Sequence, residues 1–217
     1  MDLLAQLRAH RLLAIVRGAS PDRAVAAALA LAEAGIPLIE VSLSGSGALD
    51  VISRVRAELG PDAPLGAGTV LSAQDARAAH RAGADFIVTP AVSDAIPAAR
   101  DLGLPVLAGV MTPTEILQAR QLGATAFKVF PATALGGPRY LRDLRGPFPG
   151  LPLVPVGGVD AASAEQYLAD GALAVGVGSP LVGDAADGGS IPALRERSLA
   201  FLDVTRKLDV TRKAVQL

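Results

Sequence analysis

The sequence predicts a closed (β/α)8 barrel. Eight short apolar runs alternate with alanine-rich segments from one end of the chain to the other, the pattern of strands and helices in an α/β protein with a parallel sheet. Five glycines recur at separations of about 20 or about 48 residues, the length of one or two strand–helix units; they are Gly35, Gly83, Gly103, Gly123 and Gly171. The 217 residues suffice for one such barrel.

The expected strands are short apolar stretches that are bounded by turn-forming residues. We expect them at residues 12–17, 37–43, 64–70, 85–90, 105–110, 124–131, 153–157 and 173–178.

Capping residues mark where the intervening helices begin. A serine or threonine precedes a proline or an acidic residue of the first helical turn, as in Ser20-Pro21-Asp22, Ser72-Ala73-Gln74-Asp75 and Thr112-Pro113-Thr114-Glu115. At the other ends, the five glycines are suited to the left-handed conformation that terminates a helix. Each is followed within a few residues by an expected strand.

An open, doubly wound sheet would also alternate strands and helices. A dinucleotide-binding fold of that kind would carry a Gly-x-Gly-x-x-Gly turn after its first strand, and Arg17-Gly18-Ala19-Ser20 does not match it. We therefore expect a single barrel domain over residues 1–217. The stretch 202–207 is repeated as 208–213, and we interpret residues 202–217 as a short helical extension without a function of its own.

Composition excludes several classes of site. The chain has no cysteine and only two histidines, so a disulfide framework, a thiolate nucleophile and a histidine-rich metal site are not expected. A formal charge of −1 and 3% aromatic residues argue against nucleic-acid binding. The mean hydropathy is +0.42, but the longest apolar run, residues 24–32, is too short to span a membrane. With no signal peptide at the N-terminus, we expect a soluble, cytoplasmic protein.

Lysine use is strongly asymmetric. Of 20 basic residues only three are lysines, and Lys207 and Lys213 lie near the C-terminus. Lys128 lies alone in an apolar expected strand, Ala126-Phe127-Lys128-Val129-Phe130. Arginine could supply charge there but not a nucleophilic amine, and burial disfavours the ammonium form, which favours the free amine that a Schiff base requires.

Glu40 and Lys128 have matching positions in their expected strands. Glu40 follows Gly35 by five residues and Lys128 follows Gly123 by five. Both strands are even-numbered, and each layer of a barrel interior draws side chains from alternate strands. The acid and the amine can therefore face one another, either as a buried pair that fills the barrel or as a nucleophile with a proton shuttle.

Thr69 is a third polar residue late in an apolar strand, where barrels of this type place their active sites. Its hydroxyl could contact a substrate or bond to the backbone.

Two glycine-rich turns follow the seventh and eighth expected strands, where (β/α)8 barrels often bind phosphate. They are Val156-Gly157-Gly158-Val159-Asp160 and Gly176-Val177-Gly178-Ser179-Pro180, and either could also be a plain tight turn. Arg17, at the end of the first strand, could bind a phosphate or carboxylate. His10 and His80 fall on expected helices away from the strand ends.

Over residues 12–182 the sequence resembles the 2-keto-3-deoxy-6-phosphogluconate aldolases and their 6-phosphogalactonate relatives. The segments that carry the resemblance are Ala14-Ile15-Val16-Arg17, Ile39-Glu40-Val41, Gly66-Ala67-Gly68-Thr69-Val70-Leu71, Phe86-Ile87-Val88-Thr89-Pro90, Thr112-Pro113-Thr114-Glu115, Phe127-Lys128-Val129-Phe130-Pro131, Gly136-Gly137-Pro138, Val156-Gly157-Gly158-Val159 and Gly178-Ser179.

The resemblance implies a metal-free, cofactor-free class I aldolase, typically a homotrimer, that cleaves a phosphorylated keto-deoxy sugar acid to pyruvate and glyceraldehyde 3-phosphate. It implies that Lys128 is the Schiff-base lysine and Glu40 the general acid/base. The pyruvate half would contact Arg17, Thr69, Pro90 and Phe130, and the phosphate would contact Gly157, Gly158, Gly178 and Ser179.

Ser44 departs from the phosphogluconate pattern, which commonly has an arginine four residues after the general base, whereas the galactonate branch has a short polar residue there. Either epimer at C4 therefore remains open as the preferred substrate. Two alternatives to the aldolase are a phosphosugar isomerase or epimerase, which would need no amine nucleophile, and a non-catalytic phosphate-binding barrel.

Overall fold

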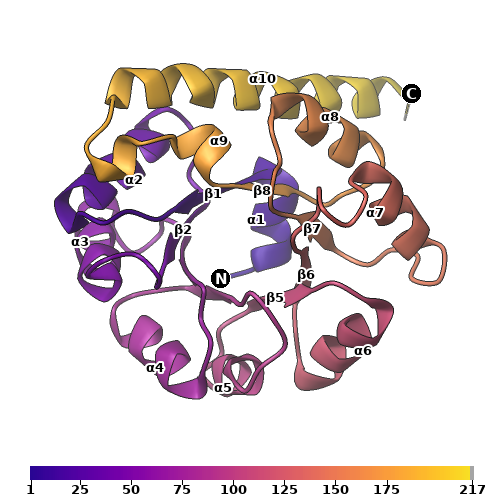
Figure 1. Cartoon of the computed structure of the whole chain (residues 1–217), viewed down its shortest axis with the longest axis horizontal. Helices are drawn as coiled ribbons and strands as arrows, with labels where there is room; N and C mark the ends of the chain where they lie inside the picture. The colour runs from indigo at the N-terminus through magenta and orange to yellow at the C-terminus, as the bar shows by residue number, and fades with distance from the viewer. Residues whose placement is uncertain (216–217) are drawn as a thin grey trace.

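The computed structural model of the chain describes the backbone of residues 1–215 and side chains as far as Arg206. Its centre is one parallel sheet of eight strands in the order β7-β6-β5-β4-β3-β2-β1-β8, curled into a barrel that the helices surround (Figure 1). The strands are β1 (Leu12–Val16), β2 (Ile39–Ser42), β3 (Leu65–Gly68), β4 (Phe86–Val88), β5 (Val106–Val110), β6 (Ala126–Val129), β7 (Leu153–Pro155) and β8 (Val175–Val177). The predicted (β/α)8 barrel is confirmed.

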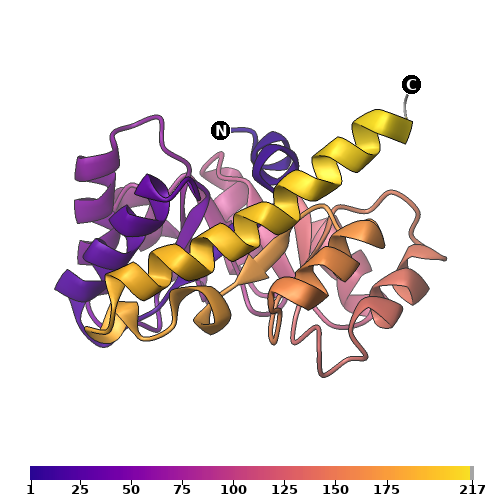
Figure 2. The same ribbon diagram turned by 90° about the horizontal axis from the view of Figure 1, so that it is seen from above.

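The outer layer consists of the helices that follow the strands. They are α2 (Pro21–Glu33), α3 (Ala48–Leu59), α4 (Ala73–Arg81), α5 (Ala95–Asp101), α6 (Pro113–Leu122), α7 (Pro138–Arg145) and α8 (Ala161–Ala169), followed after β8 by α9 (Ser179–Val182), the 3-10 helix η1 (Ala185–Asp187) and α10 (Ile191–Val215). Helix α10 packs against α2 and α8 and runs obliquely along one side of the barrel (Figure 2). Helix α10 contains both copies of the sequence repeat. Residues 216–217 of the expected extension lie outside the described residues, as do the side chains of Lys207 and Lys213.

All eight expected strands are present, each shorter than its predicted range. The third ends at Gly68 because Thr69 has a φ of 55°, which breaks the extended conformation. Arg17 likewise follows the end of β1 rather than lying within it.

The helix-end glycines behave alike. All five have φ between 74° and 101°. In each case the glycine N–H donates to the carbonyl three residues back, and the next N–H donates to the carbonyl five residues before it. These are Schellman-type endings, so the predicted equivalence of the turns at Gly35 and Gly123 is confirmed.

Capping also follows the prediction, with one exception. Ser72 with Asp75 and Thr112 with Glu115 form reciprocal capping boxes. Ser20 occupies the N-cap position of α2, but its side chain makes no capping hydrogen bond, so Pro21 in the first turn marks this helix start without help from the serine hydroxyl.

The barrel closes weakly between its first and last strands in the sheet order. Strands β7 and β8 are joined by an isolated parallel bridge between Val156 and Gly176, and Leu173 donates its N–H to the Leu153 carbonyl at 2.9 Å. A Cβ on Gly176 would lie 2.6 Å from Cγ2 of Val156. The absence of a side chain at Gly176 therefore lets the seam close.

The floor of the barrel is covered by α1 (Leu3–His10), which Figure 1 shows behind the ring of strands. Leu3 and Leu7 are fully buried and join the interior cluster that includes Phe86, Leu107 and Val154. A separate cluster lies between the strands and the outer helices. The lumen is therefore packed from below, and space for a ligand remains at the C-terminal ends of the strands. Within the described residues, no helix combines the length and apolar character needed to cross a lipid bilayer.

Candidate active site

A cavity of about 640 Å³ opens at the C-terminal ends of the strands, the usual position of active sites in this fold. Every site residue expected from the sequence lines it. These residues are Arg17, Glu40, Thr69, Pro90, Lys128, Phe130, Gly157, Gly158, Gly178 and Ser179. His10 and His80 lie on α1 and α4, as expected, and do not line this cavity.

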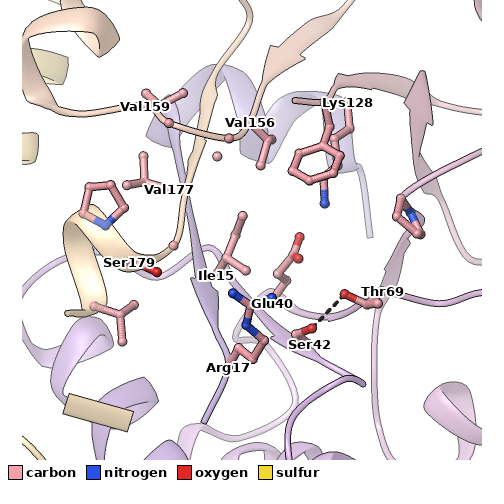
Figure 3. Close-up of a pocket in the computed structure, with 18 of the residues that line it drawn as sticks. Ile15, Arg17, Glu40, Ser42, Thr69, Lys128, Val156, Val159, Val177 and Ser179 are labelled. Atoms are coloured by element: carbon pink, nitrogen blue, oxygen red, sulfur yellow. Dashed lines mark hydrogen bonds between the residues drawn. The ribbon is translucent and has the colours of Figure 1, made fainter. Parts of the chain in front are cut away.

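Strand alternation points Lys128 and Glu40 into the lumen. Successive side chains of a strand point to opposite faces, and the residues two positions before each, Ala126 and Leu38, belong to the interior cluster. Figure 3 shows the amine of Lys128 and the carboxylate of Glu40 pointing into the same space. The predicted facing arrangement of the two groups is therefore present.

Both groups are buried. Lys128 is 6% exposed and Glu40 is 1% exposed. Burial raises the pKa of the Glu40 carboxyl above its ordinary value, and the positive charge of Lys128 partly opposes that rise. One carboxyl oxygen, Oε2, has no hydrogen-bond partner. This carboxyl is therefore easier to protonate than an exposed one and has an oxygen available to a bound molecule.

Phe130 forms a wall beside the amine. The Nζ atom of Lys128 lies 5.4 Å from the centre of the Phe130 ring, within the range of a cation–π contact. The ring is 38% exposed, so it borders both the amine and the opening of the cavity.

The glycines of β3 leave room for two neighbouring side chains, Glu40 and Phe86. A Cβ on Gly68 would lie 2.2 Å from Oε1 of Glu40, and one on Gly66 would lie 2.3 Å from the ring of Phe86. Contacts this short cannot be accommodated against packed side chains. Gly68 thus leaves room for the Glu40 carboxylate, and Gly66 leaves room for the Phe86 ring.

Thr69 turns back toward the lumen after β3. Gly68 faces the lumen, so continued alternation would point Thr69 outward. Its φ of 55° breaks the alternation; its hydroxyl lines the cavity and lies 2.7 Å from Oγ of Ser42 (Figure 3). A β-branched residue in this conformation is rare and marks a strained position.

The opposite wall is built from the glycine-rich turns after β7 and β8. Gly157 and Gly158 have φ values of 96° and 74°, and added Cβ atoms would approach Phe130 at 3.1 Å and Thr133 at 2.7 Å. Gly178 precedes α9, in which Ser179 is the first residue. Arg17 reaches the same cavity from β1, which pairs with β8. The glycine-rich wall itself therefore offers mainly backbone groups, and Arg17 adds a guanidinium to the same cavity.

The sequence of this chain is similar to those of known aldolases. Residues 3–190 match the model of the KDPG and KHG aldolase family. The chain belongs to this aldolase family.

Among individual aldolases, the 2-dehydro-3-deoxy-6-phosphogalactonate aldolase of Escherichia coli K12 is 34% identical over 198 residues, which are 90% of this chain and 95% of the relative. A native KDPGal structure superposes with a TM-score of 0.83 at 34% identity, covering 95% of this chain and 96% of the other. A KDPG aldolase from Legionella pneumophila, captured with pyruvate as a covalent carbinolamine intermediate, gives a TM-score of 0.80 at 27% identity, covering 93% and 97%.

The aldolase cavity also contains residues that were not expected individually as site residues. Five belong to the two glycine-rich turns noted in the sequence, namely Val156, Val159, Gly176, Val177 and Pro180, and four lie outside those turns, namely Ile15, Ser42, Val182 and Gly183. Ser42 and Ile15 could have been found by alternation, since Ser42 follows Glu40 by two residues and Ile15 precedes Arg17 by two. Ser44, noted as a departure from the phosphogluconate pattern, lines the cavity as well. Within the described residues, no group of three or more His, Asp or Glu side chains is arranged to hold a metal ion.

Proposed function

We propose that this chain is a class I aldolase that reversibly cleaves a 2-keto-3-deoxy-6-phospho-sugar acid, the gluconate epimer, the galactonate epimer or both, to pyruvate and glyceraldehyde 3-phosphate. One observation carries the proposal: a buried lysine amine shares a cavity with a buried carboxyl that has an unpartnered oxygen. The carbinolamine captured in the Legionella relative is the intermediate that such an amine forms with pyruvate.

Lys128 is the nucleophile in this mechanism. Its free amine attacks the C2 carbonyl of the keto acid, and loss of water from the carbinolamine leaves an iminium ion. The iminium accepts the electron pair of the C3–C4 bond as that bond breaks, which releases the aldehyde and leaves an enamine on Lys128. Protonation of the enamine at C3 and hydrolysis of the imine then release pyruvate.

Glu40 moves the protons. As a carboxylate it accepts the proton of the C4 hydroxyl, directly or through a water, and as a carboxylic acid it returns a proton to C3. Its raised pKa suits the return of a proton, because burial makes this carboxyl easier to protonate than an exposed one.

The remaining residues divide the cavity between the two halves of the substrate. Arg17, Thr69, Pro90 and Phe130, which line the cavity, would hold the pyruvate half. The backbone of Gly157, Gly158, Gly178 and Ser179 would hold the phosphate. Backbone N–H groups in glycine-rich turns commonly bind this anion, and the cavity is large enough for both halves.

Four further inferences accompany the proposal, on domain count, oligomeric state, compartment and partners. We infer that the chain forms one domain, because a single eight-stranded sheet runs from β1 to β8. We also propose a homotrimer, as the resemblance to phosphogluconate aldolases implies, and a location in the cytoplasm. A small-molecule substrate is the only partner that the reaction requires.

Borohydride trapping with pyruvate tests the function. Reduction of the imine should leave an N-(1-carboxyethyl) group on Lys128, and peptide mapping is simple because the sequence has only two other lysines. Lys128→Arg should fold but lose both trapping and cleavage, because a guanidinium stays protonated.

The peptides that contain Lys207 and Lys213 serve as internal controls and should stay unlabelled. A phosphosugar isomerase, an epimerase or a phosphate-binding barrel would give no adduct at Lys128. Undiminished trapping in Lys128→Arg would assign the nucleophile elsewhere.

A further inference from the structure

Three hydroxyl groups form a continuous chain along one wall of the cavity. Oγ of Ser42 lies 2.7 Å from Oγ1 of Thr69 and 2.8 Å from Oγ of Ser44, and all three residues line the cavity. Ser42, in the middle, is only 2% exposed, whereas Ser44 is exposed at the rim. A buried serine therefore joins the half-buried hydroxyl of Thr69 to the exposed hydroxyl of Ser44.

The number of protons limits how many hydrogen bonds these three hydroxyl groups can donate to a ligand in the cavity. Each hydroxyl carries one proton, so Ser42 can donate to one neighbour and must accept from the other. If Ser42 donates to Thr69, Ser44 donates to Ser42, and the proton of Thr69 is free. If Ser42 donates to Ser44, the free proton is on Ser44. A third pattern would leave the proton of Ser42 without either neighbour, which is costly at a buried position.

Of the two outer hydroxyls, Thr69 and Ser44, one can therefore donate a hydrogen bond to a ligand while the other can only accept one. We propose that Ser42 couples the two ends, so that binding of the keto-acid carboxylate fixes Ser44 as an acceptor for a hydroxyl of the sugar chain. This inference rests on the proposed function, in which the pyruvate half lies against Thr69. A carboxylate has no proton to donate, so Thr69 donates to it, Ser42 donates to Thr69, and Ser44 donates to Ser42.

The coupling makes Ser42 a specificity-determining residue, although Thr69 and Ser44, and not Ser42, would contact the substrate. An isolated serine hydroxyl rotates and can donate or accept. Held as an acceptor, Ser44 favours a substrate group that carries a proton over one of similar size that does not. Ser42 thereby couples binding of the keto-acid carboxylate to the part of the pocket that contacts the aldehyde.

The aldol addition of pyruvate provides the test. The two aldehydes are glyceraldehyde 3-phosphate and its 2-fluoro analogue, in which a fluorine of similar size replaces the hydroxyl and cannot donate. The wild-type enzyme should prefer the hydroxyl compound in kcat/KM by about tenfold or more, the usual effect of one mispaired hydrogen bond.

Ser42→Ala should reduce this preference to about threefold or less, chiefly by improving the use of the fluoro compound, because Ser44 is then free to rotate and donate to it. Ser42→Thr, which restores a hydroxyl, should recover the preference. A purely structural role would lower kcat/KM for both aldehydes without changing their ratio.

Ser44→Ala, at the exposed rim, should also reduce the preference and does not depend on repacking a buried site. Ser53→Ala, on α3 and outside the cavity, is the matched control and should keep the wild-type ratio. An unchanged ratio in Ser42→Ala, or no preference in the wild type, would overturn the coupling. Borohydride trapping of the wild type is measured in parallel: failure of trapping would refute the aldolase, whereas normal trapping with an unchanged ratio would refute only the coupling.

Discussion

At the scale of single residues, Glu40 combines two requirements that conflict. Its carboxyl must be available to a substrate, so one oxygen has no partner within the protein. The same burial penalises the charged form and raises the pKa. In the proposed mechanism, the charged form that burial disfavours is the proton acceptor beside the amine.

Glu40→Gln should affect catalysis and stability in opposite directions. Exchange of the methyl protons of pyruvate should slow by about 10²–10⁴-fold, the usual contribution of a positioned acid or base. Because folding raises the pKa, protonated Glu40 stabilises the fold below its ordinary pKa of 4.5, and this stability is lost as the pH rises through the folded value. Glutamine does not titrate, so the stability of the variant relative to wild type should increase from pH 5 to pH 8.

Proton exchange followed by NMR and thermal melts across this pH range measure the two effects. Equal exchange rates would transfer the proton shuttle to a water or another group. A stability difference that is constant with pH would show that Glu40 has no raised pKa in the fold.

Individual site residues could be predicted from the sequence where a charged side chain occurred within an otherwise apolar strand. A single lysine in an apolar segment and an acid at the same distance from a helix-ending glycine indicated Lys128 and Glu40. Ser42 was missed because a serine at the end of a strand is chemically ordinary. Its importance depends on Thr69, 27 positions away in sequence, and on a positive φ that sequence pattern does not reveal for a threonine.

At the scale of secondary-structure elements, local sequence determines where helices end more sharply than where strands end. The five helix-ending glycines share one hydrogen-bonding pattern, which is why their spacing predicted the register of the strands after them. Strand ends were less predictable, because apolar character continues into the loops that line the cavity, as it does at Pro90 and Phe130.

Two helix starts that look alike in sequence should respond differently to the same change. Thr112→Ala removes an acceptor for the Glu115 N–H and a donor to the Glu115 carboxylate, and loss of such a cap costs about 1 kcal/mol. For a domain of this size, that loss should lower Tm by about 2–4 °C. Ser20→Ala removes no capping bond and should shift Tm by less than about 1 °C.

Calorimetry of Thr112→Ala, Ser20→Ala and the wild type measures the three Tm values. Equal losses of Tm would mean that Ser20 caps its helix in solution or that the box at Thr112 contributes nothing.

At the scale of the whole molecule, the barrel could be predicted because it repeats. Each strand–helix unit carries similar signals, so an ambiguous unit is supported by its neighbours. Two global features do not repeat and were not predicted. One is the weak seam between β7 and β8, which depends on the fit of Val156 against Gly176. The other is the use of α1 to cover the floor, since its leucines carry no signal of where they will pack.

The covered floor has a consequence for the sequence of events in a catalytic cycle. Because Leu3, Leu7 and the interior cluster fill the lumen from below, ligands enter and leave only at the C-terminal ends of the strands. In the proposed mechanism, the pyruvate fragment is still attached to Lys128, which is 6% exposed, when the C3–C4 bond breaks, so the aldehyde should depart first and pyruvate last. In steady-state cleavage, pyruvate should then inhibit competitively and glyceraldehyde 3-phosphate non-competitively; the reverse pattern would mean that the inner product has its own exit.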